Sequence, residues 1–102
     1  MPLRTCLAAA ALGAAQLPSL AADLSRAEEI VKGQCAMCHG EQGESSSPVF
    51  PRLAGQHAAY LDNQLKQFNK RERNNDNAVM HSVAEKMTAL EMAAVSEYLS
   101  GK

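Results

Sequence analysis

Residues 35–39 read Cys-Ala-Met-Cys-His, and this short stretch decides how the rest of the chain is interpreted. Two thiols, Cys35 and Cys38, are separated by two residues, and the imidazole of His39 follows directly. At this spacing the two sulfurs reach the two vinyl groups of one porphyrin, and the imidazole lies under the iron as its proximal ligand. The pattern is C-x-x-C-H, which is typical of c-type haem attachment. It predicts one haem c, bound covalently through Cys35 and Cys38.

Three other sites use closely spaced cysteines, and the chain offers each of them less support. A thioredoxin-like redox pair needs a βαβ context, and no stretch of this chain has the pattern of a hydrophobic strand. A tetrahedral zinc site needs two further ligands at suitable spacing, and only His57 and His81 remain. A structural disulfide leaves His39 without a role. Haem attachment is therefore the preferred interpretation.

The first 21 residues have the features of a secretory signal peptide. Arg4 is followed by an apolar stretch over 7–17, by Pro18, and by small residues up to Ala22. We expect residues 1–21 to be removed, together with Cys6, and residues 22–102 to form one domain in an oxidising compartment. The alternative is a membrane anchor, which needs about 20 apolar residues.

Composition limits what the domain can do alone. Of 102 residues, 46% are hydrophobic, but alanine inflates that share, and the chain has two Phe, two Tyr and no Trp. A domain of this size buries only about 60% of its unfolded surface, so a large prosthetic group would complete its core. The formal net charge of −1 gives no basic footprint, so nucleic acid is not an expected partner.

Outside the motif, the pattern predicts an all-α fold. A capping-box sequence at Ser25 to Glu28 predicts a short helix that ends at Gly33, and a second capping box at Thr88 to Glu91 predicts a terminal helix before Gly101. Apolar residues at helical spacing predict a helix over 56–68. The stretches 40–51 and 69–77 are polar or rich in Gly, Ser and Pro, which indicates surface loops. We expect the two terminal helices to pack against each other.

Three stretches resemble class I cytochrome c, in particular the small bacterial periplasmic members of the c-four and c-five-five-three kind. They are AEEIVKGQCAMCHG at 27–40, PRLAGQHAAYLDNQLKQF at 51–68, and a methionine ahead of a terminal helix that ends SEYLSGK. The resemblance implies the class I fold, with terminal helices packed together, further helices around one haem, and a location in the periplasm.

The resemblance also implies a second axial ligand. Met80 begins the sequence MHSVA, which is similar to the family's M-x-x-V-A, and it lies in the expected loop before the last helix. The family uses a methionine there to complete the coordination of iron. Met37 lies between the two cysteines, and Met87 and Met92 sit at helical spacing as expected core residues.

Pro51 and two histidines complete the implied site. Pro51 opens a stretch similar to the family's P-x-L-x-G turn, whose proline carbonyl accepts a hydrogen bond from the proximal imidazole, here His39. His81 is the rival axial ligand, and a bis-histidine site would have a lower potential. We expect His81 to be solvated instead, and His57 to lie on the surface.

The charged residues near the site are harder to assign. Arg52 and Arg73 have guanidinium groups that suit haem propionates, although solvated surface charges are an equally good interpretation. The family often has glycine shortly after the equivalent of Phe68, and this chain reads Asn-Lys-Arg-Glu-Arg over 69–73, so the path of that loop stays open. A possible docking patch for an acidic redox partner comprises Lys66, Lys70, Arg71 and Arg73.

Iron with both axial positions filled by protein leaves no place for substrate. We therefore predict a soluble, monomeric periplasmic electron carrier and not an enzyme. It would shuttle single electrons between respiratory partners, from a respiratory complex or dehydrogenase to a terminal oxidase or reductase. Two alternatives stay open. The protein binds gases or catalyses at the iron if Met80 is not a ligand, or it is a fixed electron-entry subunit of a larger oxidoreductase.

Overall fold

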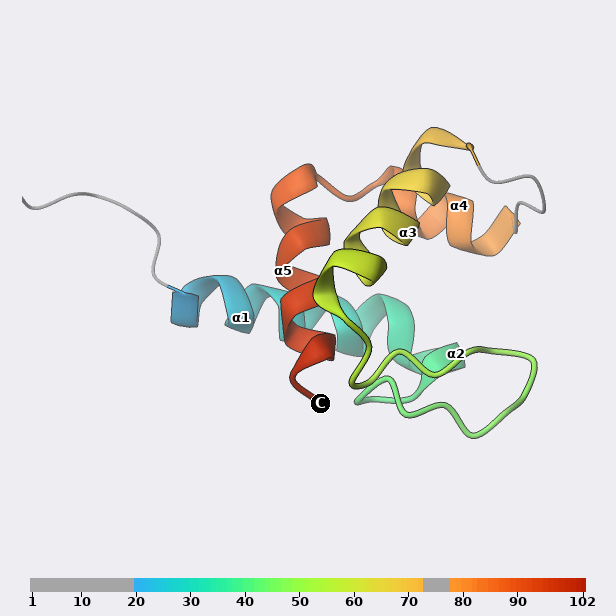
Figure 1. Ribbon diagram of the computed structural model, residues 1–102, viewed down its shortest axis with the longest axis horizontal. Coiled ribbons are helices and arrows are strands. Elements are labelled where there is room, and N and C mark those ends of the chain that lie inside the picture. Colours follow the sequence, from blue (N-terminus) through green and yellow to red (C-terminus); the bar gives the residue numbers. More distant parts are fainter. Residues whose placement is uncertain (1–19, 73–77) are drawn as a thin grey trace, which may run out of the picture.

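The computed structural model describes residues 20–72 and 78–102, and all secondary structure in this part of the chain is helical. The predicted all-α class is thus confirmed, and none of these helices is long and apolar enough to cross a membrane. The predicted signal peptide lies almost wholly outside the described residues. The elements, shown in Figure 1, are α1 (Leu20–Ile30), the π-helical turn η2 (Val31–Cys35), α2 (Ala36–His39), α3 (Ala58–Lys70), α4 (Ala78–Glu85) and α5 (Ala89–Ser100).

The first and last helices cross and form the centre of the core, as predicted (Figure 1). Ala27 and Val31 are fully buried on the amino-terminal side, and Val95 and Leu99 face them from α5 with at most 2% exposure. The small Ala27 lets the two backbones approach closely. Leu61 of α3 belongs to the same cluster, so α3 packs against this crossing.

The amino-terminal helix differs from its prediction at both ends. Ser25 was expected to be the N-cap, but it lies inside α1, which begins at Leu20. The residues ahead of Ser25 include leucines and alanines that favour helix, so nothing locally ends the helix there. Gly33 does not end it either. The chain passes through η2, where the backbone N–H of Ala36 donates to the carbonyl of Val31, and then continues as α2.

The loop between α2 and α3 folds back onto the end of α5. Gly43 has a φ of +74°, and its carbonyl accepts from the backbone N–H groups of Leu53 and Ala54 at 2.8 and 3.0 Å. A Cβ atom on Gly43 would lie 2.8 Å from a methyl carbon of Leu99. The N–H of Gly55 donates to the Leu99 carbonyl at 2.9 Å. The loop is therefore built on the core although most of its side chains are exposed.

The carboxy-terminal helix begins at the predicted capping box. The Thr88 side chain accepts from the N–H of Glu91 at 3.1 Å, and the Glu91 carboxylate accepts from the N–H of Thr88 at 3.0 Å. Arg26 of α1 reaches the same carboxylate, with 3.0 Å between Nη2 and Oε2. Because two backbone donors and a cation are satisfied together, the start of α5 is tied to α1.

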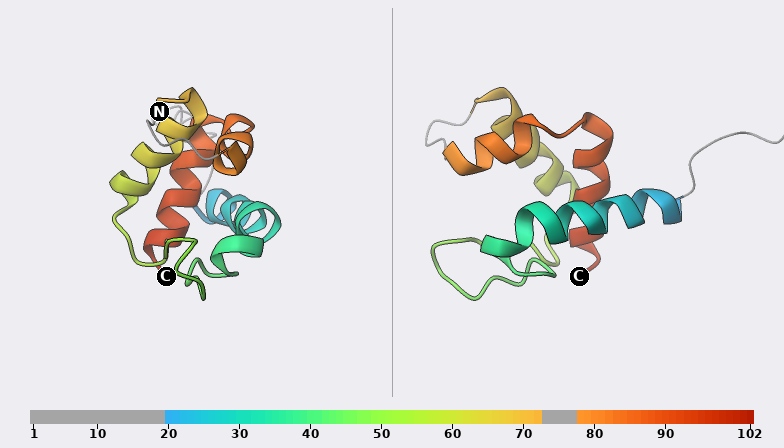
Figure 2. Two further views of the ribbon diagram at one scale, coloured as in Figure 1. Left: turned by 90° about the vertical axis from the view of Figure 1, so that its right-hand side faces the viewer. Right: turned by 180° about the vertical axis from the view of Figure 1, so that it is seen from behind.

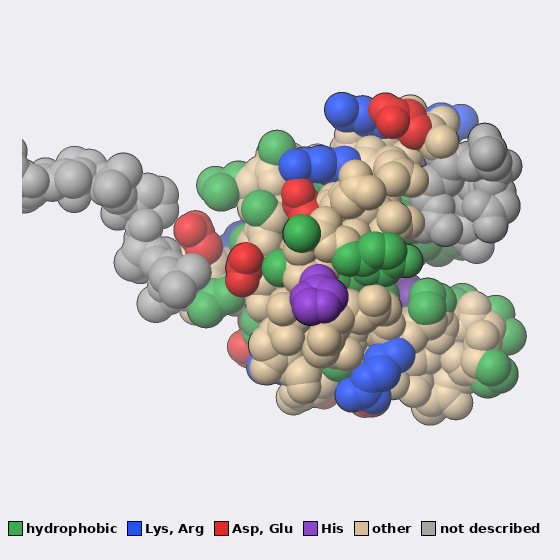
Figure 3. Space-filling model, in the orientation of Figure 1, with side chains coloured by type: hydrophobic (Ala, Val, Ile, Leu, Met, Phe, Trp, Pro, Cys, Tyr) green, Lys and Arg blue, Asp and Glu red, His purple; other side chains and the backbone are tan. Residues whose placement is uncertain are grey.

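Helix α4 and most of α3 lie above α1, and α2 with its loop lies below it, in all three views of Figures 1 and 2. Figure 3 shows the surface hollowed between these two parts, on the right-hand side of the view. We call this feature the hollow between α2 and α4. It is open to solvent along one side of the molecule.

Candidate functional site

The two cysteines of the motif sit where the amino-terminal helix meets the hollow. Cys35 ends η2 and packs against the core cluster, and Cys38 lies on α2; the two are not joined in a disulfide. Burial raises the pKa of the Cys35 thiol to about 11. A reactive C-x-x-C pair needs the opposite, a thiolate stabilised by a lowered pKa. The burial of Cys35 therefore disfavours the thiolate that the nucleophilic cysteine of a thioredoxin-type pair requires.

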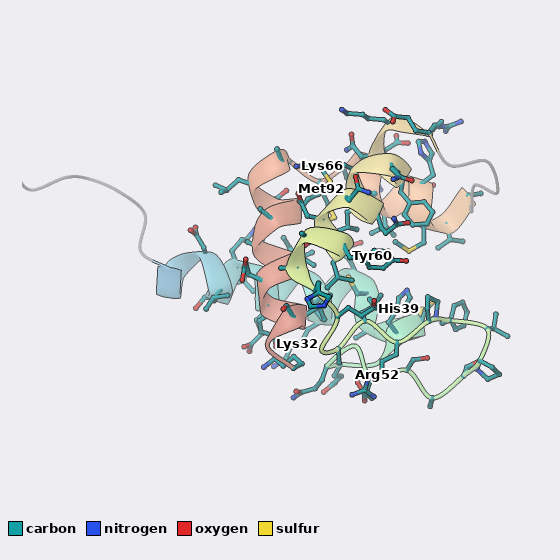
Figure 4. The ribbon with its side chains drawn as sticks, in the orientation of Figure 1. Lys32, His39, Arg52, Tyr60, Lys66 and Met92 are labelled. Atoms are coloured by element: carbon teal, nitrogen blue, oxygen red, sulfur yellow. The ribbon has the colours of Figure 1, made fainter. Side chains whose placement is uncertain are left out.

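His39 is held in one orientation by the chain that follows the loop. Its side chain is 6% exposed, and Nδ1 lies 2.8 Å from the carbonyl oxygen of Pro51. A carbonyl can only accept, so Nδ1 carries the proton and the lone pair of Nε2 is left to bind a metal. The Phe50 ring lies against the imidazole, with 6.1 Å between ring centroids in an edge-on arrangement. Figure 4 shows His39 beside the hollow.

Met80 lies in helix α4 and not in a loop, which corrects the expectation for this residue. The first two residues of the expected loop over 69–77 belong to α3, which continues to Lys70, and residues 73–77 lie outside the described part of the chain. In the shared orientation of Figures 1 and 3, α4 lies above the hollow and α2 below it, so Met80 and His39 belong to segments on either side of it.

The segments around the hollow carry exposed apolar side chains. Large hydrophobic residues with at least 37% exposure occur on each of them, namely Met37 on α2, Val49 and Phe50 in the loop, Tyr60 on α3 and Val79 on α4. Figure 4 shows Tyr60 pointing from α3 toward the region of His39. Two thiols can attach haem c and the oriented imidazole can ligate its iron. The exposed apolar side chains suit contact with a hydrophobic ring.

His81 is buried, although it was expected to be solvated. Its side chain is 5% exposed, its Nδ1 lies 2.8 Å from the carbonyl oxygen of Phe68, and its Nε2 contacts Arg71 and Glu85. The reason is helical geometry, because His81 shares the inward face of α4 with the buried Ala84 three residues later. Both ring nitrogens are therefore engaged within the protein.

The other sequence predictions near the site have mixed outcomes. Met92 is 4% exposed and Met87 packs against the core cluster, so both are core residues as predicted, and His57 is exposed as expected.

Arg52 is turned to the backbone of its own loop, where it donates to the carbonyls of Ala54 and Glu44. Arg73 lies outside the described residues. Among described side chains there is no cluster of His, Cys, Asp and Glu that would hold a metal ion alone.

Sequence reasoning missed Asn69. Its side-chain amide donates to the carbonyl of Ala84 at 2.8 Å and to that of Met87 at 3.4 Å, so it joins the end of α3 to the end of α4. Asn69 was interpreted as part of a polar loop. The available signal was its place directly after Phe68, because a helix that continues by two residues, to Lys70, includes Asn69.

Fold and site together define an all-helical protein built around one covalently attached haem. The cytochrome c family model matches residues 24–101, and the chain belongs to the cytochrome c family. Its haem c is attached through Cys35 and Cys38, the two cysteines of the family motif. These results confirm the family resemblance, the fold class and the cofactor that the sequence predicted.

Similar proteins agree with this assignment. Cytochrome c4 of Azotobacter vinelandii is 39% identical over 91 residues, which cover 84% of this chain and 43% of that protein. Cytochrome c-554(548) of Halomonas halodenitrificans is 31% identical, and the match covers 80% of this chain and 99% of that protein. The crystal structure of reduced recombinant cytochrome c4 from Pseudomonas stutzeri superposes with a TM-score of 0.72 at 33% identity, over 79% of this chain and 48% of that one.

The chain thus spans less than half the length of the cytochromes c4 that it matches, and nearly the whole length of the c-554(548) protein.

Proposed function

We propose that this protein is a periplasmic electron carrier with His39 and Met80 as the axial ligands of its single haem. It takes one electron from a reduced donor protein and passes it to an oxidised acceptor. The haem iron supplies the one-electron chemistry. The chain attaches the ring through Cys35 and Cys38, fixes the proximal imidazole, and covers the ring with apolar side chains.

The observation that carries the proposal is the hydrogen bond of 2.8 Å between His39 Nδ1 and the Pro51 carbonyl. It fixes the tautomer that leaves Nε2 for the iron. It also raises the basicity of the imidazole, so that Nε2 is a stronger electron-pair donor to the metal. A strong, rigid proximal ligand suits electron transfer, in which the coordination should change little between ferric and ferrous states.

Met80 is the best candidate for the second ligand among the methionines downstream of the motif. Met87 and Met92 contribute to the core, whereas Met80 is partly exposed on the helix across the hollow from α2. The neighbouring His81 has both ring nitrogens engaged with protein groups, which disfavours it as the ligand.

Docking to redox partners is proposed at the open side of the hollow, through a small and transient interface. The basic patch of Lys66, Lys70, Arg71 and Arg73 has less support as a docking surface than the sequence suggested. Lys66 pairs with Asp62 at 2.7 Å and is shown on α3 in Figure 4, and Arg71 contacts His81. Because Lys66 is paired with a carboxylate and Arg71 is held against His81, apolar contact near the exposed ring edge is the better basis for recognition.

The test is an optical spectrum of the purified exported protein in its oxidised and reduced forms, with M80A as the variant. We expect a weak sulfur-to-iron band in the far red for the oxidised wild type and no binding of carbon monoxide to the reduced form. M80A should lose the band and bind carbon monoxide. A wild type that lacks the band and binds carbon monoxide readily would instead indicate an open iron site, suited to ligand binding or catalysis.

A further inference from the structure

Two helices next to the proposed ligand are joined by a buried histidine. His81 follows Met80 on α4, and its imidazole lies against the last turn of α3. Its Nδ1 lies 2.8 Å from the carbonyl oxygen of Phe68. Because this carbonyl can only accept, the ring donates to it, and the bond joins α4 to α3.

The carbonyl that receives this bond belongs to the cap of α3. Helix α3 ends at Lys70 and is capped by Arg71, a residue other than glycine in the left-handed conformation, with φ of 57° and ψ of 41°. Its N–H donates to the Phe68 carbonyl at 3.3 Å. That conformation is unfavourable for a residue other than glycine, because its Cβ lies too close to the following carbonyl oxygen. Arg71 adopts this left-handed conformation in the same turn in which its side chain contacts His81.

A second bond of the same kind anchors the far end of α4. The Asn69 amide donates to the Ala84 carbonyl at 2.8 Å, so α4 is attached to α3 at one point beside Met80 and at another one turn later. Helix α4 has only eight residues, and isolated helices of that length are not stable in water. Its position therefore depends on these side-chain bonds and on the burial of Ala84.

We infer that His81 is a positioning residue for Met80: its bond to the Phe68 carbonyl fixes the place and rotation of α4 and thereby holds the thioether sulfur at the iron. Successive helical residues are turned by about 100°, so fixing the His81 side chain against α3 also fixes the direction in which Met80 leaves the helix. The inference rests on the proposed function, since it takes Met80 as the ligand.

The test compares three variants of the haem-loaded protein with the wild type. H81L keeps the approximate volume and removes the donor. H81N keeps a side-chain N–H that can reach the Phe68 carbonyl, and neither variant retains an imidazole. H57L is the matched control, because His57 is exposed. For each protein, the far-red band is followed with temperature, carbon monoxide binding is measured at 25 °C, and global unfolding is followed by circular dichroism.

We expect the far-red band of H81L to disappear well below its unfolding temperature, and the fraction of protein in which Met80 has left the iron to rise on the order of 2- to 10-fold over the wild type, the population shift that follows the loss of one hydrogen bond. H81L should then bind carbon monoxide under conditions in which the wild type does not. H81N should restore most of the wild-type behaviour, and H57L should not differ from the wild type. If H81L keeps the band up to global unfolding and gains no affinity, His81 has no positioning role even though Met80 remains the ligand. If the wild type itself lacks the band, the ligand assignment fails, and this inference fails with it.

Discussion

The Nδ1 atom of His39 lies 2.8 Å from the carbonyl oxygen of Pro51, across a loop of eleven intervening residues that is folded onto the end of α5. The bond links the motif to a turn that is itself anchored by Gly55 to the Leu99 carbonyl. The orientation of the imidazole is therefore set by the core of the domain and not by the short helix α2 that carries it.

The backbone carbonyl at position 51 does not require proline. P51A keeps the acceptor but frees the φ angle in the unfolded chain, so we expect the free energy of unfolding to fall by about 0.4–1 kcal/mol with the optical spectrum unchanged. Denaturant unfolding of the haem-loaded protein measures the first quantity. A high-spin spectrum for P51A would mean that the ring of proline, and not only its carbonyl, holds His39.

Each cysteine should provide one of two independent bonds to the haem. C35A and C38A should each retain the haem after extraction with acidified acetone, and the reduced pyridine complex should absorb at longer wavelength because one vinyl group stays conjugated with the ring. The double variant should release the haem. Complete release from either single variant would contradict attachment at both residues.

Substitution by alanine should have opposite effects on the free energy of unfolding at Gly43 and at Gly33. Gly43 has a positive φ, and a Cβ there would lie 2.8 Å from Leu99, so G43A should cost roughly 1–3 kcal/mol. Gly33 lies in the helical segment with open space around its Cα, so G33A should stabilise the protein by about 0.5–1 kcal/mol. Thermal unfolding of both variants compares the two. If G43A raised the unfolding temperature as much as G33A, the loop around Gly43 would have to move to accommodate the added methyl group.

The capping box of α5 should make stability depend on pH. The hydrogen bond from the Thr88 N–H, and then the Arg26 guanidinium, hold the pKa of Glu91 below its ordinary value of 4.5. Because the folded pKa is lower than the unfolded one, this stabilisation is complete above about pH 5 and is lost as pH falls through the folded value. E91Q should be less stable than the wild type at pH 7, and the difference should shrink as pH is lowered below 4.

T88A is the control for that experiment. It removes the hydroxyl that accepts the Glu91 N–H, and it should cost about 1 kcal/mol at pH 7 through a neutral bond that does not titrate. Urea unfolding of the three proteins between pH 3 and 7 separates the two effects. If the deficit of E91Q stays constant over that range, the Glu91 charge does not contribute.

Features set by local chemistry were predictable from the sequence. The Thr88 capping box begins α5 as expected, because both of its bonds are made within four residues. The family motif predicted the cofactor, since its chemistry requires two thiols and an imidazole at fixed spacing. The crossing of the terminal helices also followed from their apolar faces.

Features set by context were not predictable in the same way. Ser25 and Glu28 have the same pattern as Thr88 and Glu91, but helix-forming residues precede Ser25, so the helix continues through it. His81 was expected to be solvated because its segment was interpreted as a loop. A helical reading of 78–85 would have placed His81 and Ala84 on one inward face, but the bond to Phe68 depends on how α3 ends, and Arg71 ends it in a conformation more typical of glycine.

The π-helical turn between Val31 and Cys35 bears on how this segment can change its length in evolution. A π-turn holds one residue more than an α-turn, so the segment already contains an insertion between the buried face of α1 and the attachment motif. Deleting one residue there would leave an ordinary α-turn, and both flanks would keep their phase. Any other change of length would rotate Cys35 and Cys38 by about 100° per residue relative to Ala27 and Val31. Sequences related to this one should therefore vary in composition between α1 and the motif, and differ in length by no more than this single residue.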